Sequence, residues 1–412
     1  MVKQTAKFSF MEEYNKIEIQ HICSNICSGG TPKSTVMEYY GGNIPWLNTK
    51  EINFSCIYET EKTITDEGLN NSSAKWIPAN SVIVAMYGAT AGKTAITKIP
   101  LTTNQACCNL TINPVKADYR FVYYALYNDY SHLASLANGG AQQNLNAQQI
   151  KEFEIPFPPL KEQKRIANFL SSIDDKIELN RRINDNLEQQ AQALFKSWFV
   201  DFEPFRGGEF VDSELGLIPK GWRVVSLGEV TKQITEKVGN REDVTVLSPI
   251  NSGELVLSEE YFTKQVFSKD LSKYLIVNPL SFAYNPARIN IGSIGLNTFD
   301  FVGCVSPVYV VFECEPNYQY FFDFFKRTAM FKDEVALRAI GGVRQSLGYN
   351  DLSLIKTIYP TSDVVVEFNN LYLKMKEVMI KNTDQNEKFI SLRDSLLPKL
   401  MSGELKINEF NC

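Results

Sequence analysis

The sequence predicts an α+β protein in which two similar modules are joined by two long, antiparallel coiled-coil helices. Three observations support this fold class. Parts of the sequence recur 202 residues further along the chain, and each copy ends in a long apolar repeat with a 3.5-residue period. Short β-like runs alternate with turns in the remaining sequence. Such a duplication predicts a pseudo-twofold molecule, suited to a partner that offers two sites.

The internal repeat keeps a single offset through nine residue pairs. Gly139, Gly140, Gln143, Leu145 and Pro158 recur as Gly341, Gly342, Gln345, Leu347 and Pro360, and Asn168, Asn180, Asn184 and Leu194 recur as Asn370, Asn382, Asn386 and Leu396. Chance matches would not stay in register over such a length. The pairs therefore indicate a duplicated unit.

The first long helix is predicted from about residue 160 to residue 200. Pro158-Pro159 is a plausible start signal, because proline is tolerated in the first helical turn. The predicted seam is Ile166, Leu170, Ile173, Ile177, Asn180, Asn184, Leu187, Ala191, Leu194 and Trp198. Steps of four and three over more than four heptads are typical of a coiled coil.

The second long helix has the same register. Its predicted seam is Phe368, Tyr372, Met375, Met379, Asn382, Asn386, Phe389, Arg393, Leu396 and Leu400. Pro398 is expected to bend its last turn and Gly403 to stop it. Two asparagines occupy matching seam positions in each helix. Buried asparagines would fix register and orientation, whereas in a looser bundle they would face solvent. Apolar residues off the first seam, namely Phe169, Ile183, Phe195 and Phe199, are expected to be exposed.

The predicted domains are residues 1–159 and 203–361 for the modules, with the helical regions at 160–202 and 362–412. Strands are expected at 81–86, 106–112, 274–277, 281–284 and 308–312, where β-branched and aromatic residues concentrate. Helices are expected at 121–127 and 320–331. Turn-rich segments separate these elements.

Composition restricts the functional classes. A net charge of −5 argues mildly against tight DNA binding by the chain alone, because phosphate neutralisation drives such binding. Eight scattered cysteines without a C-x-x-C pair, and only two histidines, make a zinc site unlikely and reduced thiols the better interpretation. The start of the sequence lacks a signal-peptide pattern, so a cytoplasmic protein without a membrane span is expected.

Three motifs resemble catalytic signatures and fail on their spacing or context. In Gly88–Thr94, three residues rather than four separate the glycines of a would-be P-loop. Phe157-Pro158-Pro159-Leu160 lacks the polar and aromatic residues that flank the prolines of an amino-methyltransferase loop. Glu162-Gln163-Lys164 has no acidic partner on a preceding strand. We therefore expect no catalytic residues and no metal site in this chain.

Across nearly its whole length the chain resembles the specificity subunits of type I restriction–modification systems. The specific segments are Phe153-Glu154-Ile155-Pro156-Phe157-Pro158-Pro159-Leu160-Lys161-Glu162-Gln163, Ala193-Leu194-Phe195-Lys196-Ser197-Trp198-Phe199 and Leu392-Arg393-Asp394-Ser395-Leu396-Leu397-Pro398-Lys399-Leu400-Met401-Ser402-Gly403. Within the modules, Ser28-Gly29-Gly30-Thr31-Pro32, Gly42-Asn43-Ile44-Pro45-Trp46, Pro219-Lys220-Gly221-Trp222, Tyr284-Asn285-Pro286-Ala287-Arg288-Ile289 and Val305-Ser306-Pro307 are family-like.

The resemblance implies two target recognition domains, each of which reads one half of an asymmetric site in double-stranded DNA. The helices would act as spacer and as docking surface for two modification subunits that methylate adenine N6. The chain itself would hold no cofactor. S-adenosylmethionine would lie on the modification subunits, and ATP and Mg on two restriction (motor-nuclease) subunits.

Candidate DNA-contacting residues follow from the side chains that can pair with base edges or phosphates in loops. In the first module they are Thr31, Lys33, Trp46, Asn48, Lys50, Tyr87, Thr90, Lys93, Gln142 and Gln143. In the second module they are Arg241, Asn251, Tyr284, Asn285, Arg288, Asn290, Ser293, Arg344 and Gln345. The alternative for each is loop packing, and Trp46 in particular is a candidate core residue. Gln143 and Gln345 occupy equivalent positions, which favours a shared role in positioning the DNA backbone.

Two rival hypotheses remain at this level. One is an NTPase built on Gly92-Lys93-Thr94, and the other is a coiled-coil scaffold without sequence-specific DNA binding.

Overall fold

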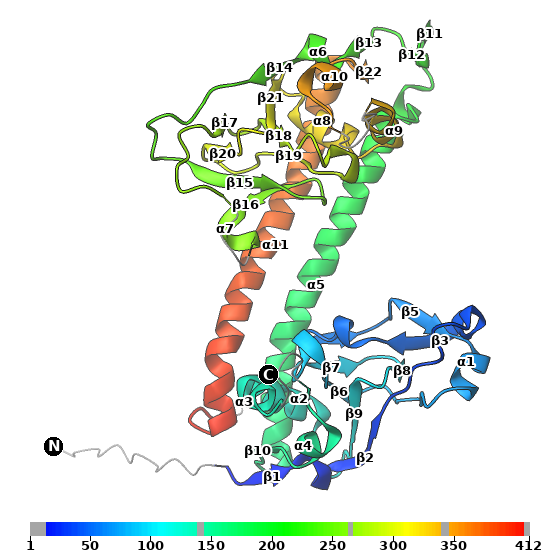
Figure 1. The fold of residues 1–412 in the computed structure, drawn as a ribbon, viewed down its shortest axis with the longest axis vertical. Helices are drawn as coiled ribbons and strands as arrows, with labels where there is room; N and C mark the ends of the chain where they lie inside the picture. Colours follow the sequence, from blue (N-terminus) through cyan, green and yellow to red (C-terminus); the bar gives the residue numbers. More distant parts are fainter. Residues whose placement is uncertain (1–13, 138–143, 263–266, 339–345, 408–412) are drawn as a thin grey trace, which may run out of the picture. The chain divides into compact units, whose positions relative to one another are not determined.

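The computed structural model describes residues 14–137, 144–262, 267–338 and 346–407. The chain divides into two compact units, one formed by Met1–Arg181 with Thr383–Cys412 and the other by Arg182–Asn382. The two long helices, α5 (Leu160–Phe199) and α11 (Ser362–Ser402), each contribute to both units (Figure 1). Each unit is described by itself. The domain boundaries given above stay a prediction.

The first unit contains two sheets and a two-stranded ribbon. The larger sheet has the strand order β2 (Cys23–Ser28), β9 (Cys107–Ile112), β6 (Val82–Ala85), β7 (Thr94–Thr97) and β4 (Ser55–Ile57). The smaller sheet has the order β5 (Lys62–Ile64), β3 (Tyr40–Leu47) and β8 (Thr102–Thr103), while β1 (Lys16–Glu18) pairs with β10 (Glu154–Pro156). β6 is buried throughout, as its uninterrupted apolar run requires. The strands expected at 81–86 and 106–112 are confirmed as β6 and β9.

The helices of the first unit's module are short. They are α1 (Asp66–Asn70), α2 (Tyr119–Asn128), α3 (Tyr130–Ser135) and α4 (Ala147–Lys151). Asp118 caps α2 by accepting hydrogen bonds from the backbone N–H groups of Arg120 and Phe121. The buried Gln163 side chain joins this cap to the start of α5. Its Oε1 accepts from Asp118 N at 3.0 Å, and its Nε2 donates to Pro158 O at 2.9 Å.

The second unit also contains two sheets, together with two ribbons. The first sheet has the order β14 (Thr231–Ile234), β21 (Val310–Cys314), β18 (Phe282–Tyr284) and β19 (Ile294–Leu296). The second has the order β16 (Leu255–Leu257), β15 (Thr245–Pro249), β20 (Gly303–Val305) and β17 (Leu275–Val277). The ribbons pair β11 (Phe210–Ser213) with β12 (Gly216–Pro219), and β13 (Arg223–Ser226) with β22 (Lys356–Tyr359). The three strands expected here are confirmed as β17, β18 and β21, although β21 begins two residues later than predicted.

The single helix expected at 320–331 is wrong, because the structure has two helices there. The helices of the second module are α6 (Leu227–Val230), α7 (Ser258–Tyr261), α8 (Gln319–Phe325), α9 (Ala329–Arg338) and α10 (Tyr349–Leu352). The break between α8 and α9 includes Lys326, whose buried side chain is tied to carbonyl groups on other segments. Tertiary contacts of this kind are not visible in a local apolar pattern.

The predicted duplication is confirmed by the strand orders of the two modules. The order β2-β9-β6-β7 in the first corresponds to β14-β21-β18-β19 in the second, and β5-β3-β8 corresponds to β16-β15-β20. The corresponding strands β3 and β15 each have one antiparallel and one parallel neighbour. The ribbon that precedes each long helix is likewise repeated, as β1-β10 and β13-β22.

The long helices pair antiparallel within each unit, through the asparagines predicted for the seam. In the first unit, Asn180 Nδ2 donates to Asn386 Oδ1 at 2.9 Å. In the second unit, Asn382 Nδ2 donates to Asn184 Oδ1 at 2.8 Å. The alternative in which these residues face solvent is therefore wrong. α5 begins directly after Pro158-Pro159 and α11 ends before Gly403, as expected. Pro398 lies inside α11, and the bend expected there stays a prediction.

Each end of the helix pair is built into a module core. Ile166 and Leu170 of α5 and Leu400 of α11 belong to the main core of the first unit. In the second unit, Phe195 of α5 packs against Phe368 of α11 with ring centroids 5.8 Å apart. The expectation that Phe195 and Phe199 are exposed is wrong, because α8 covers this face of α5. Phe169 and Ile183 are exposed, as expected.

Among the described residues, no helix is both long enough and apolar enough to cross a membrane.

Candidate nucleic-acid interface

Both modules present a hairpin loop at the same end of corresponding sheets, β2-β9-β6-β7-β4 in the first module and β14-β21-β18-β19 in the second. In the first module β6 and β7 are joined by residues 86–93, which include a 3-10 turn at Gly88–Thr90. In the second module β18 and β19 are joined by residues 285–293, which include a 3-10 turn at Ile289–Ile291. The loops carry seven of the predicted DNA-contacting residues, namely Tyr87, Thr90, Lys93, Asn285, Arg288, Asn290 and Ser293. The fold thus places candidate residues of both modules in hairpin loops at equivalent positions.

The repeated glutamines lie outside the described residues, as do Gln142 and Arg344. The segments that follow them nevertheless return to the hairpin loops in both modules. Leu145 N donates to Met86 O at 2.8 Å, and Leu347 N donates to Pro286 O at 3.1 Å. Gln142, Gln143, Arg344 and Gln345 therefore stay predictions.

In the first module, the turn before strand β9 lies beside the hairpin loop. This turn contains a candidate residue that the sequence analysis missed. Met86 N donates to Ala106 O at 2.8 Å, which places the exposed Gln105 beside the hairpin loop. Thr31 Oγ1 donates to Gln105 Oε1. Gln105 could have been found from its type, because glutamine pairs with adenine edges, and from its position directly before a predicted strand.

The Gly29-Gly30 pair in the same region is explained by packing. A Cβ atom on Gly29 would lie 2.2 Å from Thr103 O, and one on Gly30 would lie 2.1 Å from Ala74 N. The glycines let residues 29–33 approach the backbone of Thr103 and Ala74 closely, and this packing positions Thr31 and Lys33.

The cationic candidates differ in how far they are already engaged. Among the described parts of the chain, the side chains of Lys33 and Arg288 are exposed and have no hydrogen-bond or ion-pair partner. Lys93 Nζ donates to Asn53 Oδ1 at 2.7 Å and lies 6.0 Å from the centroid of the Phe54 ring. Among the candidate cations that the structure describes, Lys33 and Arg288 are therefore the ones that DNA could engage without breaking an existing contact.

Lys50 and Arg241 are paired with carboxylates. Lys50 forms an ion pair with Glu61, whose hydrogen bond raises the pKa of the lysine. Arg241 donates two hydrogen bonds of 3.0 Å to the Asp243 carboxylate, and this lowers the pKa of Asp243. To contact DNA, either cation would have to leave its carboxylate. We therefore expect Lys50 and Arg241 to contribute less to the free energy of DNA binding than an unpaired cation.

The proposed DNA contacts of Trp46, Tyr284 and Ser293 are contradicted by their burial. Trp46 is 4% exposed and donates its indole N–H to Gly30 O at 2.9 Å. Tyr284 is 0% exposed, and burial raises the pKa of its hydroxyl group. Ser293 is 3% exposed and donates to Pro249 O at 2.8 Å. Their residue types suit DNA contacts, but their side chains point into the protein.

The two remaining asparagine candidates support loops. Asn48 caps the 3-10 turn at Thr49–Glu51 through a reciprocal arrangement with Glu51. Asn251 is exposed, and its backbone lies against the second hairpin loop, since a Cβ atom on Gly292 would lie 2.7 Å from Asn251 O. Gly292 has a φ of +93°, so this contact and the backbone conformation both require glycine.

A buried lysine fixes the base of the second hairpin loop. Lys326 is 6% exposed, and its Nζ donates to Gly253 O at 2.5 Å and Ile294 O at 3.1 Å, while pairing with Asp323 Oδ1 at 2.7 Å. Burial lowers the pKa of this ammonium group, and the charge of Asp323 opposes the shift. Tyr124 occupies the equivalent repeat position in the first module and donates to Asp174 Oδ2 at 2.6 Å. At this repeat position the two modules therefore differ, because Lys326 contacts the base of a hairpin loop whereas Tyr124 contacts the long helix α5.

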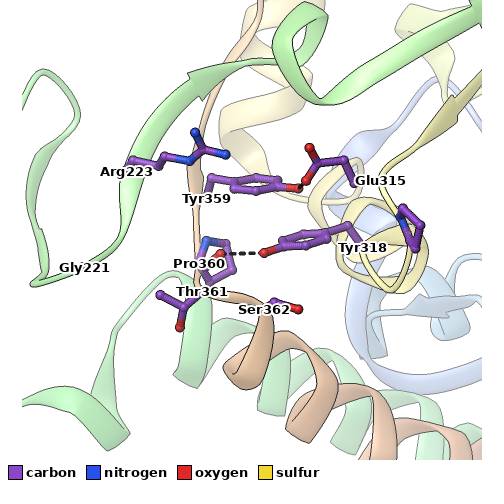
Figure 2. A pocket seen from close by; sticks show the side chains of 9 residues that line it. Gly221, Arg223, Glu315, Tyr318, Tyr359, Pro360, Thr361 and Ser362 are labelled. Carbon is purple, nitrogen blue, oxygen red and sulfur yellow. Dashed lines mark hydrogen bonds between the residues drawn. The ribbon is translucent and has the colours of Figure 1, made fainter.

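A cavity of about 510 Å³ lies away from these loops, where β22 leads into α11 (Figure 2). The Tyr359 and Tyr318 rings stack at 4.2 Å, and the Arg223 guanidinium lies 5.3 Å from the Tyr359 centroid. Tyr359 donates to Glu315 Oε2 at 2.5 Å, and Tyr318 donates to Pro360 O at 2.8 Å (Figure 2). Because these polar side chains form hydrogen bonds within the protein, we interpret the cluster as a structural one that fixes the start of α11.

Comparison with known proteins finds similar sequences among type I restriction enzyme specificity subunits. Residues 11–189 match the family model described as "Type I restriction modification DNA specificity domain". The type I restriction enzyme MjaIX specificity subunit of Methanocaldococcus jannaschii is 29% identical over 399 residues, which cover 93% of this chain and 92% of the relative. The HindI specificity subunit of Haemophilus influenzae is 23% identical over 354 residues, covering 67% of this chain and 74% of the relative.

The fold agrees with these matches. A solved type I restriction–modification S subunit from M. genitalium aligns with a TM-score of 0.58 at 18% identity, covering 97% of this chain and 98% of that one. A duplicated α+β fold with paired helices is the class of fold that this chain shares with that S subunit. In sequence, the chain is similar over nearly its whole length to a type I restriction enzyme specificity subunit, and residues 11–189 match the DNA specificity domain of such systems.

Proposed function

We propose that each module of this chain reads one half of a bipartite, asymmetric site in double-stranded DNA. The observation that carries the proposal is the repeated hairpin loop, which stands at one sheet end in both modules and carries different side chains in each. Tyr87 and Lys93 occupy the first loop, whereas Asn285 and Arg288 occupy the second. A repeated scaffold with different reading groups suits two half-sites of different sequence.

The paired helices would set the distance between the half-sites and dock two adenine-N6 methyltransferase subunits. Two restriction subunits would complete the complex. In this proposal the chain is the non-catalytic subunit and holds no cofactor of its own. S-adenosylmethionine belongs to the modification subunits, and ATP and Mg to the restriction subunits. The protein would work in the cytoplasm, where it meets cellular DNA. The exposed apolar side chains of Phe169 and Ile183 on α5 support docking, since partner subunits would cover them.

Methylome sequencing tests the proposal directly. A host without other adenine methylation would express this chain together with the modification subunit of its own system. We expect one bipartite motif, methylated in both halves at a fixed spacing. Expression of the modification subunit alone is the control and should leave the motif unmethylated. Methylation without a sequence motif would favour the scaffold function and would overturn the proposal.

A further inference from the structure

Val308 is exposed at the tip of a turn in the second module. Its side chain is 72% exposed, and the turn is closed by a hydrogen bond of 2.9 Å from Tyr309 N to Ser306 O. The turn leads directly into β21. Single exposed apolar residues are common on protein surfaces, so exposure alone assigns no role. The position of Val308 in the sheet is what distinguishes it.

The register of the sheet places Val308 beside the hairpin loop. In the antiparallel pair of β18 and β21, Tyr284 lies opposite Val310. Two residues further along each strand, this register brings Pro286 level with Val308. Pro286 belongs to the loop that carries Arg288, whose exposed guanidinium is one of the free cations described above. Val308 and Arg288 therefore extend beyond the same end of the same sheet.

The equivalent turn of the first module carries a different side chain. It is closed by a hydrogen bond of 3.2 Å from Cys107 N to Asn104 O, so Ala106 occupies the place of Val308. Ala106 is 6% exposed, whereas Val308 is 72% exposed. The second module thus offers an exposed isopropyl group where the first has a buried methyl group.

We propose that Val308 reads the C5 methyl group of a thymine in the half-site bound by the second module. The inference rests on the proposed function and names one determinant within it. Thymine is the only unmodified base that presents a methyl group in the major groove, and apolar side chains recognise it by contact. The Val308 side chain has no polar atom, so it can contact a base only through its apolar surface.

Deoxyuridine isolates this contact, because it differs from thymine only by the missing methyl group. The chain in complex with its modification subunits would methylate duplexes in which each thymine of the second half-site is replaced in turn. We expect one replacement to lower the methylation rate at limiting enzyme about fourfold, the effect of one buried methyl group. The remaining replacements should have little effect.

The Val308→Ala variant should remove the preference for thymine over deoxyuridine at that position and keep the rest of the motif. Val115→Ala is the matched control, since Val115 is also highly exposed but lies in the first module. It should leave the preference unchanged. The inference is overturned if no replacement matters to the unmodified protein, or if the preference survives in Val308→Ala. The absence of any motif would instead overturn the proposed function.

Discussion

Asn180 and Asn386 join the two long helices by a buried hydrogen bond of 2.9 Å between Nδ2 and Oδ1. Asn386 Nδ2 in turn donates to Ile177 O at 3.3 Å. A polar pair in an apolar seam is satisfied in one register only, because a shifted helix would leave both amides without partners. This pair specifies the antiparallel alignment within the first unit.

Replacing one partner of this pair should destabilise the protein. Asn180→Leu leaves the Asn386 Oδ1 atom buried without its donor, so we expect a loss of about 1–3 kcal/mol in the free energy of unfolding. The double variant with Asn386→Leu should recover most of that loss. Denaturant unfolding measures both, with the exposed Asn168→Leu as control. Equal losses in the single and double variants would contradict a specific pair.

Arg288→Ala should impair recognition of one half-site only. If Arg288 bonds a guanine, we expect a loss of about 1–3 kcal/mol in binding and relaxed specificity at one base. If it bonds a phosphate, binding should weaken for all sequences and the salt dependence should become shallower. Lys93→Ala is the reciprocal variant and should affect the other half-site. Methylated-motif sequencing for both variants tests the assignment, which fails if Arg288→Ala changes the half-site affected by Lys93→Ala.

Alkaline pH should destabilise the first unit through Tyr124. Burial raises the pKa of this hydroxyl group, and the negative charge of Asp174 raises it further. The raised pKa means that folding favours the neutral form. Its contribution to stability is complete below the ordinary tyrosine pKa of about 10, and is lost as the pH rises through the folded-state pKa.

Tyr124→Phe should therefore reduce the loss of stability between pH 9 and 11, values chosen to lie on either side of about 10. At neutral pH it should cost about 1.5–3 kcal/mol, because a hydrogen bond to a carboxylate is lost. Thermal unfolding at both pH values provides the measurement. An unchanged pH dependence in the variant would show that other groups are responsible.

The helices should act as a ruler if they set the spacing of the DNA site. Residues 181–187 and 379–385 are facing heptads, because Asn184 pairs with Asn382 and Asn180 with Asn386. Removing both keeps the seam in register and shortens the helix pair by about 10 Å. We expect the spacer to contract by at most about three base pairs, at roughly 3.4 Å each. Both half-site sequences should stay the same.

Removing residues 181–187 alone is the control for this experiment. It removes Asn184 and leaves Asn382 without its partner, and it shortens one helix by a heptad relative to the other, so it should abolish methylation. Full methylation at the original spacing by the double deletion would show that the helices do not determine the spacer.

Several features of the candidate site could be predicted from the sequence and others could not. The hairpin loops that carry Lys93 and Arg288 lie between β-like runs, so residue type and turn position were sufficient to find them. Trp46 and Tyr284 have equally suitable side chains, but the protein surrounds them. Gln105 could have been found from its type and its position before a predicted strand, whereas Val308 was missed because its place beside the hairpin loop depends on the register of β18 and β21. Register across a sheet is a long-range property, and no local pattern reports it.

The sequence by itself determined the duplicated units, the two long helices and their polar seam positions, because a 3.5-residue apolar period and a constant offset are local or repetitive signals. The tertiary structure decided which side chains remain available to a partner. Phe195 and Phe199 have the spacing of an outer helix face, yet they are buried because α8 packs over them. Burial depends on what distant segments bring to a surface, and only the folded chain assembles those contacts.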